Sequence, residues 1–207
     1  MGLRELIEEI NFLTDGNDEN FGWFDLERFK SHIKELCSKN DKDGFYSWNG
    51  LRYFLYEYEL YLQDSANTKV SWEDFAKRNK EDTIEHIYPQ TATDPYWKKR
   101  FGYYNSTERR LNLNSLGNLL LLSRSKNSKL QNYSFDEKKC LCDRRTGQEI
   151  GYYNGSYSEI QVSQKKEWTA DEIKNRGVDM LRFMEKRWNF RFSDWNIEMD
   201  DILFPTK

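Results

Sequence analysis

The sequence predicts a mostly helical α+β protein, and three observations support this class. Only 3 prolines and 11 glycines occur in 207 residues, which favours helices over a β sandwich. Apolar residues recur at helical spacing in several segments, whereas two apolar runs, at residues 83–87 and 119–122, have the length of strands. Aromatic residues form 16% of the chain and charged residues 32%, so aromatic side chains must supply much of the core.

The N-terminal region, residues 1–80, is predicted to be helical. Apolar residues follow helical periodicity in three segments, at residues 3–13, 24–38 and 48–62. Polar loops or turns separate these segments, at residues 15–20 and 40–44. A capping-box-like start at Ser71 predicts one more short helix.

The central segment, residues 81–146, is predicted to begin with a strand at residues 83–87. A long connection follows at residues 88–113, and basic residues are interleaved there with aromatic ones. This interleaving suits a nucleic-acid surface. Trp97 and Phe101 are instead expected to pack beneath the connection.

The second apolar run follows Asn118 and is predicted to be the second strand. Ser123 or Ser125 is expected to cap a short helix behind it, because serine side chains accept hydrogen bonds from the free N–H groups of a helix start. A further short helix is expected over residues 134–142.

Residues 147–207 are predicted to form a loop followed by one long helix. The loop signal covers residues 143–164, with a short hairpin expected at residues 147–153. Thr169 opens a capping box ahead of an apolar stripe at helical spacing. The aromatic tail from residue 190 either packs back on the body or docks a partner.

The net charge of −3 is unevenly distributed along the chain. Residues 81–146 contain 12 basic and 8 acidic residues, whereas residues 1–80 contain 11 basic and 16 acidic ones. A basic central segment suits phosphate binding, although ordinary solvated surfaces also carry an excess of this size.

Cysteine usage and the lack of long apolar runs bear on location. No apolar run is long enough to cross a membrane, and the acidic N-terminus does not resemble a secretory signal. Three cysteines without framework spacing indicate reduced thiols, so a cytoplasmic location is expected. The spacing of Cys140 and Cys142 is poor for chelation and Cys37 is the one remaining thiol, so a structural zinc site is not expected.

Two short strings in the central segment carry groups suited to phosphodiester chemistry. His86 follows Glu85 near the end of the first apolar run, and Asn127 lies on the short helix after the second. An imidazole can take a proton from water, and a divalent cation held by carboxylate and amide oxygens can neutralise a phosphate. Neighbouring side chains of a regular strand point to opposite faces, so Glu85 and His86 can reach one ion only if the strand bends or ends at this pair. Pro89 is close enough to mark such a bend or strand end.

Each of these residues also has an ordinary structural interpretation. A lone histidine in an apolar run is more often a buried, hydrogen-bonded residue, and Glu85 alone would be a solvent-facing strand charge. Asn118 alone would be a turn or strand-start residue, and Asn127 alone would be a helix cap or surface residue. Only the ordered combination favours a catalytic site.

The ordered strings resemble the HNH, or ββα-metal, nuclease motif. More narrowly, they resemble the HNH domain of the GmrSD family of modification-dependent restriction endonucleases. The resemblance is carried by three blocks: Ile84-Glu85-His86-Ile87-Tyr88-Pro89-Gln90, Leu116-Gly117-Asn118-Leu119, and Asn127 to Leu130. Ser134-Phe135-x-x-Lys138-Lys139 and Glu167-Trp168-Thr169 also look like that family.

The resemblance implies a fold, namely a ββα-metal HNH core over residues 81–146 flanked by N-terminal helices and a C-terminal helix. It also implies roles. His86 would be the general base that activates water. Asn118 would hold the loop and orient the His86 side chain. Asn127 would bind Mg²⁺ or Mn²⁺; Glu85 stands where HNH enzymes usually carry a metal-binding aspartate, and its extra methylene leaves direct ligation open. Three cations would contact DNA phosphates: Arg124, Lys126 and Lys129.

The function implied by the resemblance is a metal-dependent HNH endonuclease. Such a hydrolase would cut DNA phosphodiester bonds in a modification-dependent, type IV-like restriction system that defends against phage. DNA, including DNA with modified bases, would be the partner, together with a ParB-like NTPase sensor domain or subunit that this chain does not resemble. The alternative is a catalytically inactive HNH-fold module that binds DNA or a protein, and RNA cleavage is a third interpretation.

Overall fold

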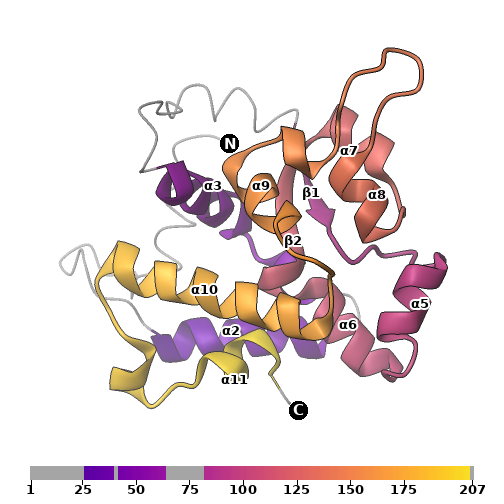
Figure 1. Ribbon diagram of the computed structural model, residues 1–207. Coiled ribbons are helices and arrows are strands. Elements are labelled where there is room, and N and C mark those ends of the chain that lie inside the picture. Colours follow the sequence, from indigo (N-terminus) through magenta and orange to yellow (C-terminus); the bar gives the residue numbers. More distant parts are fainter. Residues whose placement is uncertain (1–25, 40–41, 64–81, 206–207) are drawn as a thin grey trace.

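The computed structural model describes residues 26–39, 42–63 and 82–205 (Figure 1). It contains one two-stranded antiparallel sheet surrounded by helices, so the predicted α+β, mostly helical class is confirmed. The helices predicted at residues 3–13 and after Ser71 lie outside the described residues. Within the described ranges, every helix is too short or too polar to span a lipid bilayer.

Two helices of the N-terminal region follow their predicted apolar stripes. Helix α2 (Leu26–Ser38) buries Leu26, Phe29, Ile33 and Leu36, and helix α3 (Leu51–Gln63) buries Leu51, Phe54, Leu55 and Tyr58. A short 3₁₀ helix, η1 (Gly44–Ser47), lies between them where the sequence predicted only a turn. Gly44 has a φ of +52°, a backbone conformation that glycine adopts most easily, and this permits the chain to turn into η1.

The sheet consists of β1 (Asp82–His86) and β2 (Leu119–Ser123), which are paired from Asp82 opposite Ser123 to His86 opposite Leu119. The short helix η2 (Leu116–Asn118) leads into β2, and helix α7 (Arg124–Leu130) leaves it. The side chain of Ser123 accepts from the backbone N–H of Lys126, so the predicted serine cap is confirmed at Ser123.

The long connection predicted between the strands contains two helices that the sequence analysis did not identify, α5 (Pro95–Phe101) and α6 (Ser106–Asn114). Asp94 caps α5, with proline at the first helical position. Asn105 begins a complete capping box at α6. Trp97 and Phe101 are buried as predicted, with exposures of 0% and 1%.

Several helical elements follow α7 before the last helix of the tail. These are α8 (Phe135–Cys140), η3 (Tyr152–Asn154), α9 (Tyr157–Ser163), α10 (Ala170–Trp188) and η4 (Phe192–Trp195). The capping residue predicted for the long helix, Thr169, accepts from the N–H of Glu172. Helix α9 replaces part of the predicted loop, because Ser156 starts another capping box. The hairpin predicted at residues 147–153 is reduced to one bridge between Cys142 and Glu149.

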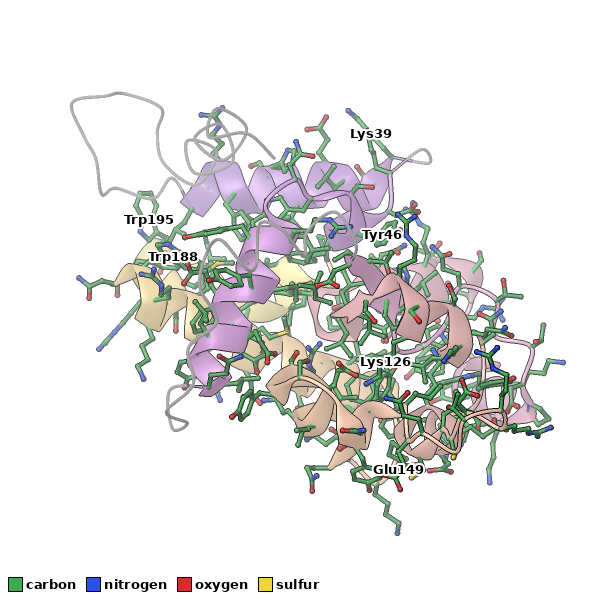
Figure 2. All side chains as sticks on the ribbon, turned by 90° about the horizontal axis from the view of Figure 1, so that it is seen from above. Lys39, Tyr46, Lys126, Glu149, Trp188 and Trp195 are labelled. Carbon is green, nitrogen blue, oxygen red and sulfur yellow. The ribbon has the colours of Figure 1, made fainter. Side chains whose placement is uncertain are left out.

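The tail packs back on the body. It ends in a short helix, α11 (Met199–Leu203), which buries Ile202 and Leu203. Trp195 remains 44% exposed at the periphery of the molecule (Figure 2).

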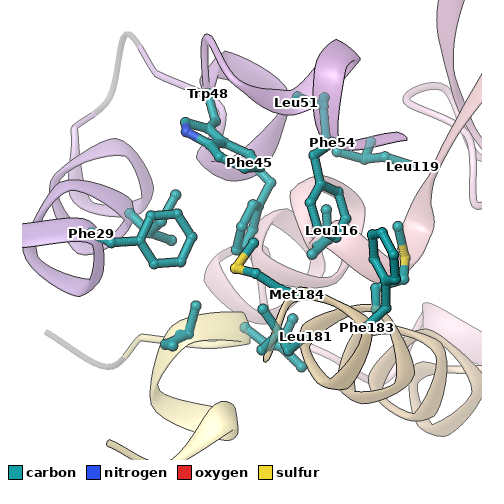
Figure 3. Packing of buried hydrophobic residues seen from close by; sticks show 14 of the residues in the cluster. Phe29, Phe45, Trp48, Leu51, Phe54, Leu116, Leu119, Leu181, Phe183 and Met184 are labelled. Atoms are coloured by element: carbon teal, nitrogen blue, oxygen red, sulfur yellow. The ribbon is translucent and has the colours of Figure 1, made fainter. Parts of the chain in front are cut away.

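The sheet lies between two hydrophobic clusters. The first cluster joins α2, α3, α10 and α11 to Leu119, with Ile84 and Leu121 packed against it (Figure 3). The second cluster joins α5, α7, α8 and α10 to Leu120 and Leu122 of the same strand. Because successive strand residues point to opposite faces, both faces of the hairpin are covered.

Gly117 marks the closest approach between η2 and α10. A Cβ atom at this position would lie 1.9 Å from the carbonyl oxygen of Ile173 and 2.7 Å from the backbone nitrogen of Gly177. Both atoms belong to the helix backbone and cannot turn away. Gly117→Ala is therefore expected to lower the free energy of unfolding by roughly 3 kcal/mol in urea titrations.

Gly177→Ala is the matched control for that substitution. Its new methyl group would meet the ends of the flexible Leu203 side chain rather than backbone. The expected change in unfolding free energy is about 1 kcal/mol or less, since alanine also favours the helix. Equal losses in the two variants would contradict the role given to the Gly117 contact.

Candidate active site

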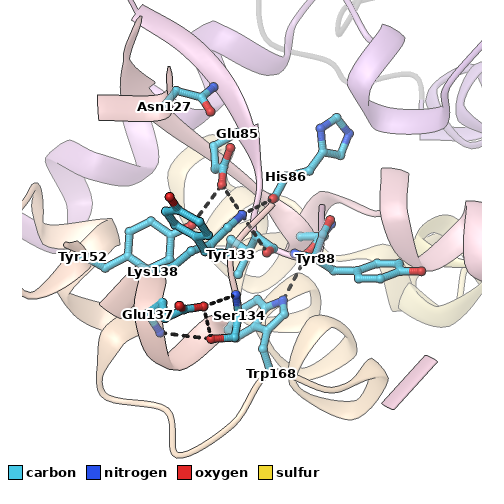
Figure 4. Close-up of polar contacts among 12 residues, drawn as sticks. Glu85, His86, Tyr88, Asn127, Tyr133, Ser134, Glu137, Lys138, Tyr152 and Trp168 are labelled. Atoms are coloured by element: carbon cyan, nitrogen blue, oxygen red, sulfur yellow. Dashed lines mark hydrogen bonds and ion pairs between the residues drawn. The ribbon is translucent and has the colours of Figure 1, made fainter. Parts of the chain in front are cut away.

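The candidate residues of the first string lie on opposite faces of β1. A bend or a strand end was predicted at Glu85 and His86, and the strand end is found, because β1 ends at His86. The pairing with β2 nevertheless stays regular through both residues, so their side chains still point to opposite faces. Glu85 lies opposite Leu120, which belongs to the second cluster, and His86 lies opposite Leu119, which belongs to the first. Figure 4 shows the two side chains leaving the strand in different directions.

Two residues, Asn114 and Tyr46, contact the His86 side chain on the face of β1 that points to the first hydrophobic cluster. The Nε2 atom of His86 lies 3.2 Å from Oδ1 of Asn114, the last residue of α6. With an amide oxygen as acceptor, Nε2 carries the proton and Nδ1 keeps the lone pair. The imidazole also packs on the ring of Tyr46 in η1, with 4.6 Å between ring centroids. The ring therefore has one defined tautomer and orientation.

Burial sets the protonation state of His86. The residue is 6% exposed, and burial lowers its pKa from 6.5 to about 4. The hydrogen bond to Asn114 opposes this shift, whereas the positive charge of Lys138 adds to it. The imidazole is neutral at pH 7 and can accept a proton, as a general base must.

Glu85 belongs to a buried charge cluster on the other face. Its Oε1 lies 2.6 Å from Nζ of Lys138 and accepts from the hydroxyl of Tyr152 at 3.2 Å (Figure 4). Lys138 is 0% exposed and Glu85 5%. Burial raises the pKa of Glu85 and lowers the pKa of Lys138, while their mutual attraction opposes both shifts. The carboxylate therefore does not face open solvent.

Asn118 fastens the chain that follows β1 to the chain that precedes β2. Its Oδ1 accepts from the backbone N–H of Tyr88 at 2.8 Å and from the indole of Trp168 at 3.1 Å. Its Nδ2 donates to the carbonyls of Tyr88 and Leu113. Its own carbonyl accepts from the N–H of Ile87, directly after His86. This geometry suits the predicted role of holding the loop.

Asn127 lies on α7, on the Glu85 side of β1. Its Nδ2 donates to the hydroxyl of Thr83 at 2.8 Å. Thr83 and Glu85 are two residues apart and share a strand face, whereas His86 points to the other face (Figure 4). The expected convergence of Glu85, His86 and Asn127 on one ion is thus not seen in this arrangement.

The three predicted phosphate-binding cations differ in their surroundings. Lys126 forms an ion pair with Glu159 and donates to the carbonyl of Asn154, and its side chain is only 13% exposed. Lys129 pairs with Asp143 at 2.6 Å and remains 41% exposed. Arg124 is exposed, and within the described ranges no acidic side chain forms an ion pair with it.

Sequence reasoning missed the residues that surround His86 and Glu85. Tyr46 and Asn114 approach His86 from elements distant in the sequence, and no local pattern indicated this. Lys138 and Trp168 lie in blocks that carried the resemblance, but neither had been given a role. Tyr152 lay in a segment predicted to be loop.

A family model for the C-terminal domain of GmrSD restriction endonucleases matches residues 28–183. The chain belongs to this family. The GmrSD C-terminal domain is an HNH-like nuclease domain, which confirms the resemblance found in the sequence. The matched range contains Tyr46, His86, Asn118, Asn127 and Lys138. No curated protein and no solved structure matches the chain.

Titration of His86 should make the stability of this GmrSD domain depend on pH. The folded pKa of about 4 lies below the ordinary value of 6.5, so below pH 6.5 the unfolded chain takes up a proton that the folded protein does not. Stability should therefore fall as the pH drops from 6.5 towards 4. The contribution of His86 is a loss of about 2 kcal/mol between pH 7.5 and pH 5.0.

Urea titrations at the two pH values measure this loss in the parent and in His86→Gln. Other titrating groups affect both proteins alike, so the difference between the two losses reports His86. An identical pH dependence in the variant would show that the imidazole is not held neutral by the fold.

Proposed function

We propose that this domain is an HNH endonuclease that hydrolyses DNA phosphodiester bonds in a modification-dependent restriction and antiphage system. The assignment as a nuclease rests on membership of the GmrSD family. One observation supports His86 as the general base: the imidazole is neutral, with Nε2 bound to Asn114 and the lone pair left on Nδ1. A water beside Nδ1 would give up its proton while it attacks phosphorus.

Two neighbours of His86 would assist it. Asn114 fixes the tautomer, because its amide oxygen takes the Nε2 proton in a hydrogen bond. Tyr46 packs on the imidazole and is itself 40% exposed, so it would be available to contact DNA beside His86. Arg124 and Lys129 would hold the phosphate backbone near α7.

We further propose that hydrolysis requires Mg²⁺ or Mn²⁺, as the resemblance implies. The predicted ligand set does not fit such an ion as it is arranged. The Glu85 carboxylate is engaged by Lys138 and Tyr152, and Asn127 alone offers a single amide oxygen, whereas hard cations prefer several oxygens including carboxylates. Within residues 26–39, 42–63 and 82–205, no three His, Cys, Asp or Glu side chains form a group that could hold a metal.

A cleavage assay with supercoiled plasmid tests the proposed endonuclease activity. The parent protein is incubated with plasmid in Mg²⁺, in Mn²⁺ and in EDTA, using plasmids with and without modified bases and an RNA substrate in parallel. Nicking or cutting of DNA in the presence of metal, abolished by EDTA, is the expected result. Cutting of RNA alone would replace the DNA assignment with an RNase.

The alternative function is an HNH-fold module that binds DNA or a protein without turnover. The engaged carboxylate of Glu85 favours it, because the acid is not open to a substrate or an ion. DNA binding by gel shift without cutting in any metal would support this alternative.

We also propose that the protein is cytoplasmic and works with a ParB-like NTPase sensor domain or subunit. A pull-down with the matching sensor protein would test this partnership.

A further inference from the structure

We infer that Lys138 is a positioning residue for His86, and that Glu85 is the counter-ion of Lys138 rather than a ligand of a divalent cation. The part concerning His86 rests on the proposed function, whereas the part concerning Glu85 does not. Lys138 lies on the face of β1 opposite to the imidazole, so it acts through the backbone.

The Lys138 ammonium has three acceptors. Nζ lies 2.6 Å from Oε1 of Glu85, 3.2 Å from the carbonyl oxygen of His86 and 3.2 Å from that of Ile87. An ammonium has three N–H groups, so all of them are used. Two of the acceptors are the carbonyl of His86 itself and the next one along the chain. The lysine therefore fixes the backbone that carries the imidazole.

Helix α8 delivers Lys138 to this place. Ser134 and Glu137 form a capping box that fixes the start of the helix. Phe135 is fully buried and packs on Trp168, with 5.5 Å between ring centroids. The Trp168 indole in turn donates to Asn118. Lys138 and Asn118 thus both hold the same stretch of chain, because Lys138 bonds the carbonyls of His86 and Ile87 and Asn118 bonds the backbone of Tyr88.

The Glu85 carboxylate already has a cationic partner, the ammonium group of Lys138. The carboxylate is 5% exposed and also accepts from the Tyr152 hydroxyl. A divalent cation on the same carboxylate would lie beside the buried ammonium. Like charges repel strongly in such a poorly solvated place, so the two cations exclude each other.

A double-mutant cycle tests the pair. Glu85→Gln and Lys138→Met each leave one buried charge without its partner, and each is expected to lower Tm by about 10 °C. The double variant removes both charges and should lose clearly less than the sum of the two single losses. Additive losses would overturn the assignment of Glu85 as the counter-ion.

Mn²⁺ titration by calorimetry tests ligation without DNA. The affinity of Glu85→Gln is expected to stay within about threefold of the parent. Loss of an outer contact already costs about 10- to 100-fold in metal sites, so a metal ligand would lose at least that much. A drop of about tenfold or more in Glu85→Gln would overturn the proposal. Equal absence of binding in both proteins would support it.

Nicking kinetics test the positioning role well below the Tm of each variant. The Glu85→Gln/Lys138→Met double variant should lower kcat at least tenfold with KM unchanged, because the imidazole is misplaced while DNA contacts remain. Lys139→Met, on the same helix, is the control and should keep the parent kcat. An unchanged kcat in the double variant would overturn the positioning role. If the parent itself does not cut, the proposed function fails, and the Tm cycle and the Mn²⁺ titration still decide the role of Glu85.

Discussion

His86→Ala is expected to reduce the rate of plasmid nicking by roughly 10³-fold, within the range that a general base contributes. The substitution removes the Nδ1 lone pair and leaves the Asn114 amide oxygen without its donor. Supercoiled and nicked plasmid are separated on agarose gels over time, with DNA binding measured in parallel. We expect binding to change little, because His86 is buried and contributes no positive charge at neutral pH.

His32→Ala is the matched control, since His32 is the other of the two histidines. It is half-buried on α2, outside the strand pair, and should retain the activity of the parent. Equal rates in His86→Ala and the parent would remove His86 from the mechanism. Equal loss in both variants would point to general damage rather than to a missing base.

Asn118→Leu is expected to lower the free energy of unfolding by roughly 4 kcal/mol. The asparagine side chain is 0% exposed and makes four hydrogen bonds. Leucine has a similar size but leaves the N–H of Tyr88, the carbonyls of Tyr88 and Leu113, and the Trp168 indole without this partner. Each unsatisfied buried group costs about 1–3 kcal/mol, partly relieved by local adjustment.

Urea titrations monitored by tryptophan fluorescence measure this loss. Asn132→Leu is the control, because Asn132 is exposed in the chain between α7 and α8, and it should change stability by about 0.5 kcal/mol or less. A loss below about 1 kcal/mol in Asn118→Leu would mean that water or a shifted loop replaces these bonds.

Local signals explain which parts of the fold the sequence predicts well. Helix α10 was predicted from the cap at Thr169 and its apolar stripe, and α7 from the serine before it. Helices α5, α6 and α9 are 7, 9 and 7 residues long, too short to show a clear apolar period. The local signal for these helices in the sequence is their capping residues, Asp94, Asn105 and Ser156.

The candidate site was predicted only in part, for a different reason. The strings identified the strand pair, and Asn118 lies where a residue that holds the loop should lie. Asn114, the partner of His86, is 28 residues away from it in the sequence. Lys138 and Tyr152, the partners of Glu85, are 53 and 67 residues away from it. Contacts over such separations depend on tertiary packing, which periodicity and capping do not encode.

The position of the strand pair between two clusters limits how this nuclease unit can be moved between proteins. A graft of residues 82–130 alone would carry the motif but leave apolar side chains on both faces of β2 without the helices that cover them. Such a fragment would aggregate or stay unfolded. A chimera or a minimal engineered enzyme must therefore bring α3 and α10 along with the motif, although these helices lie on either side of it in the sequence.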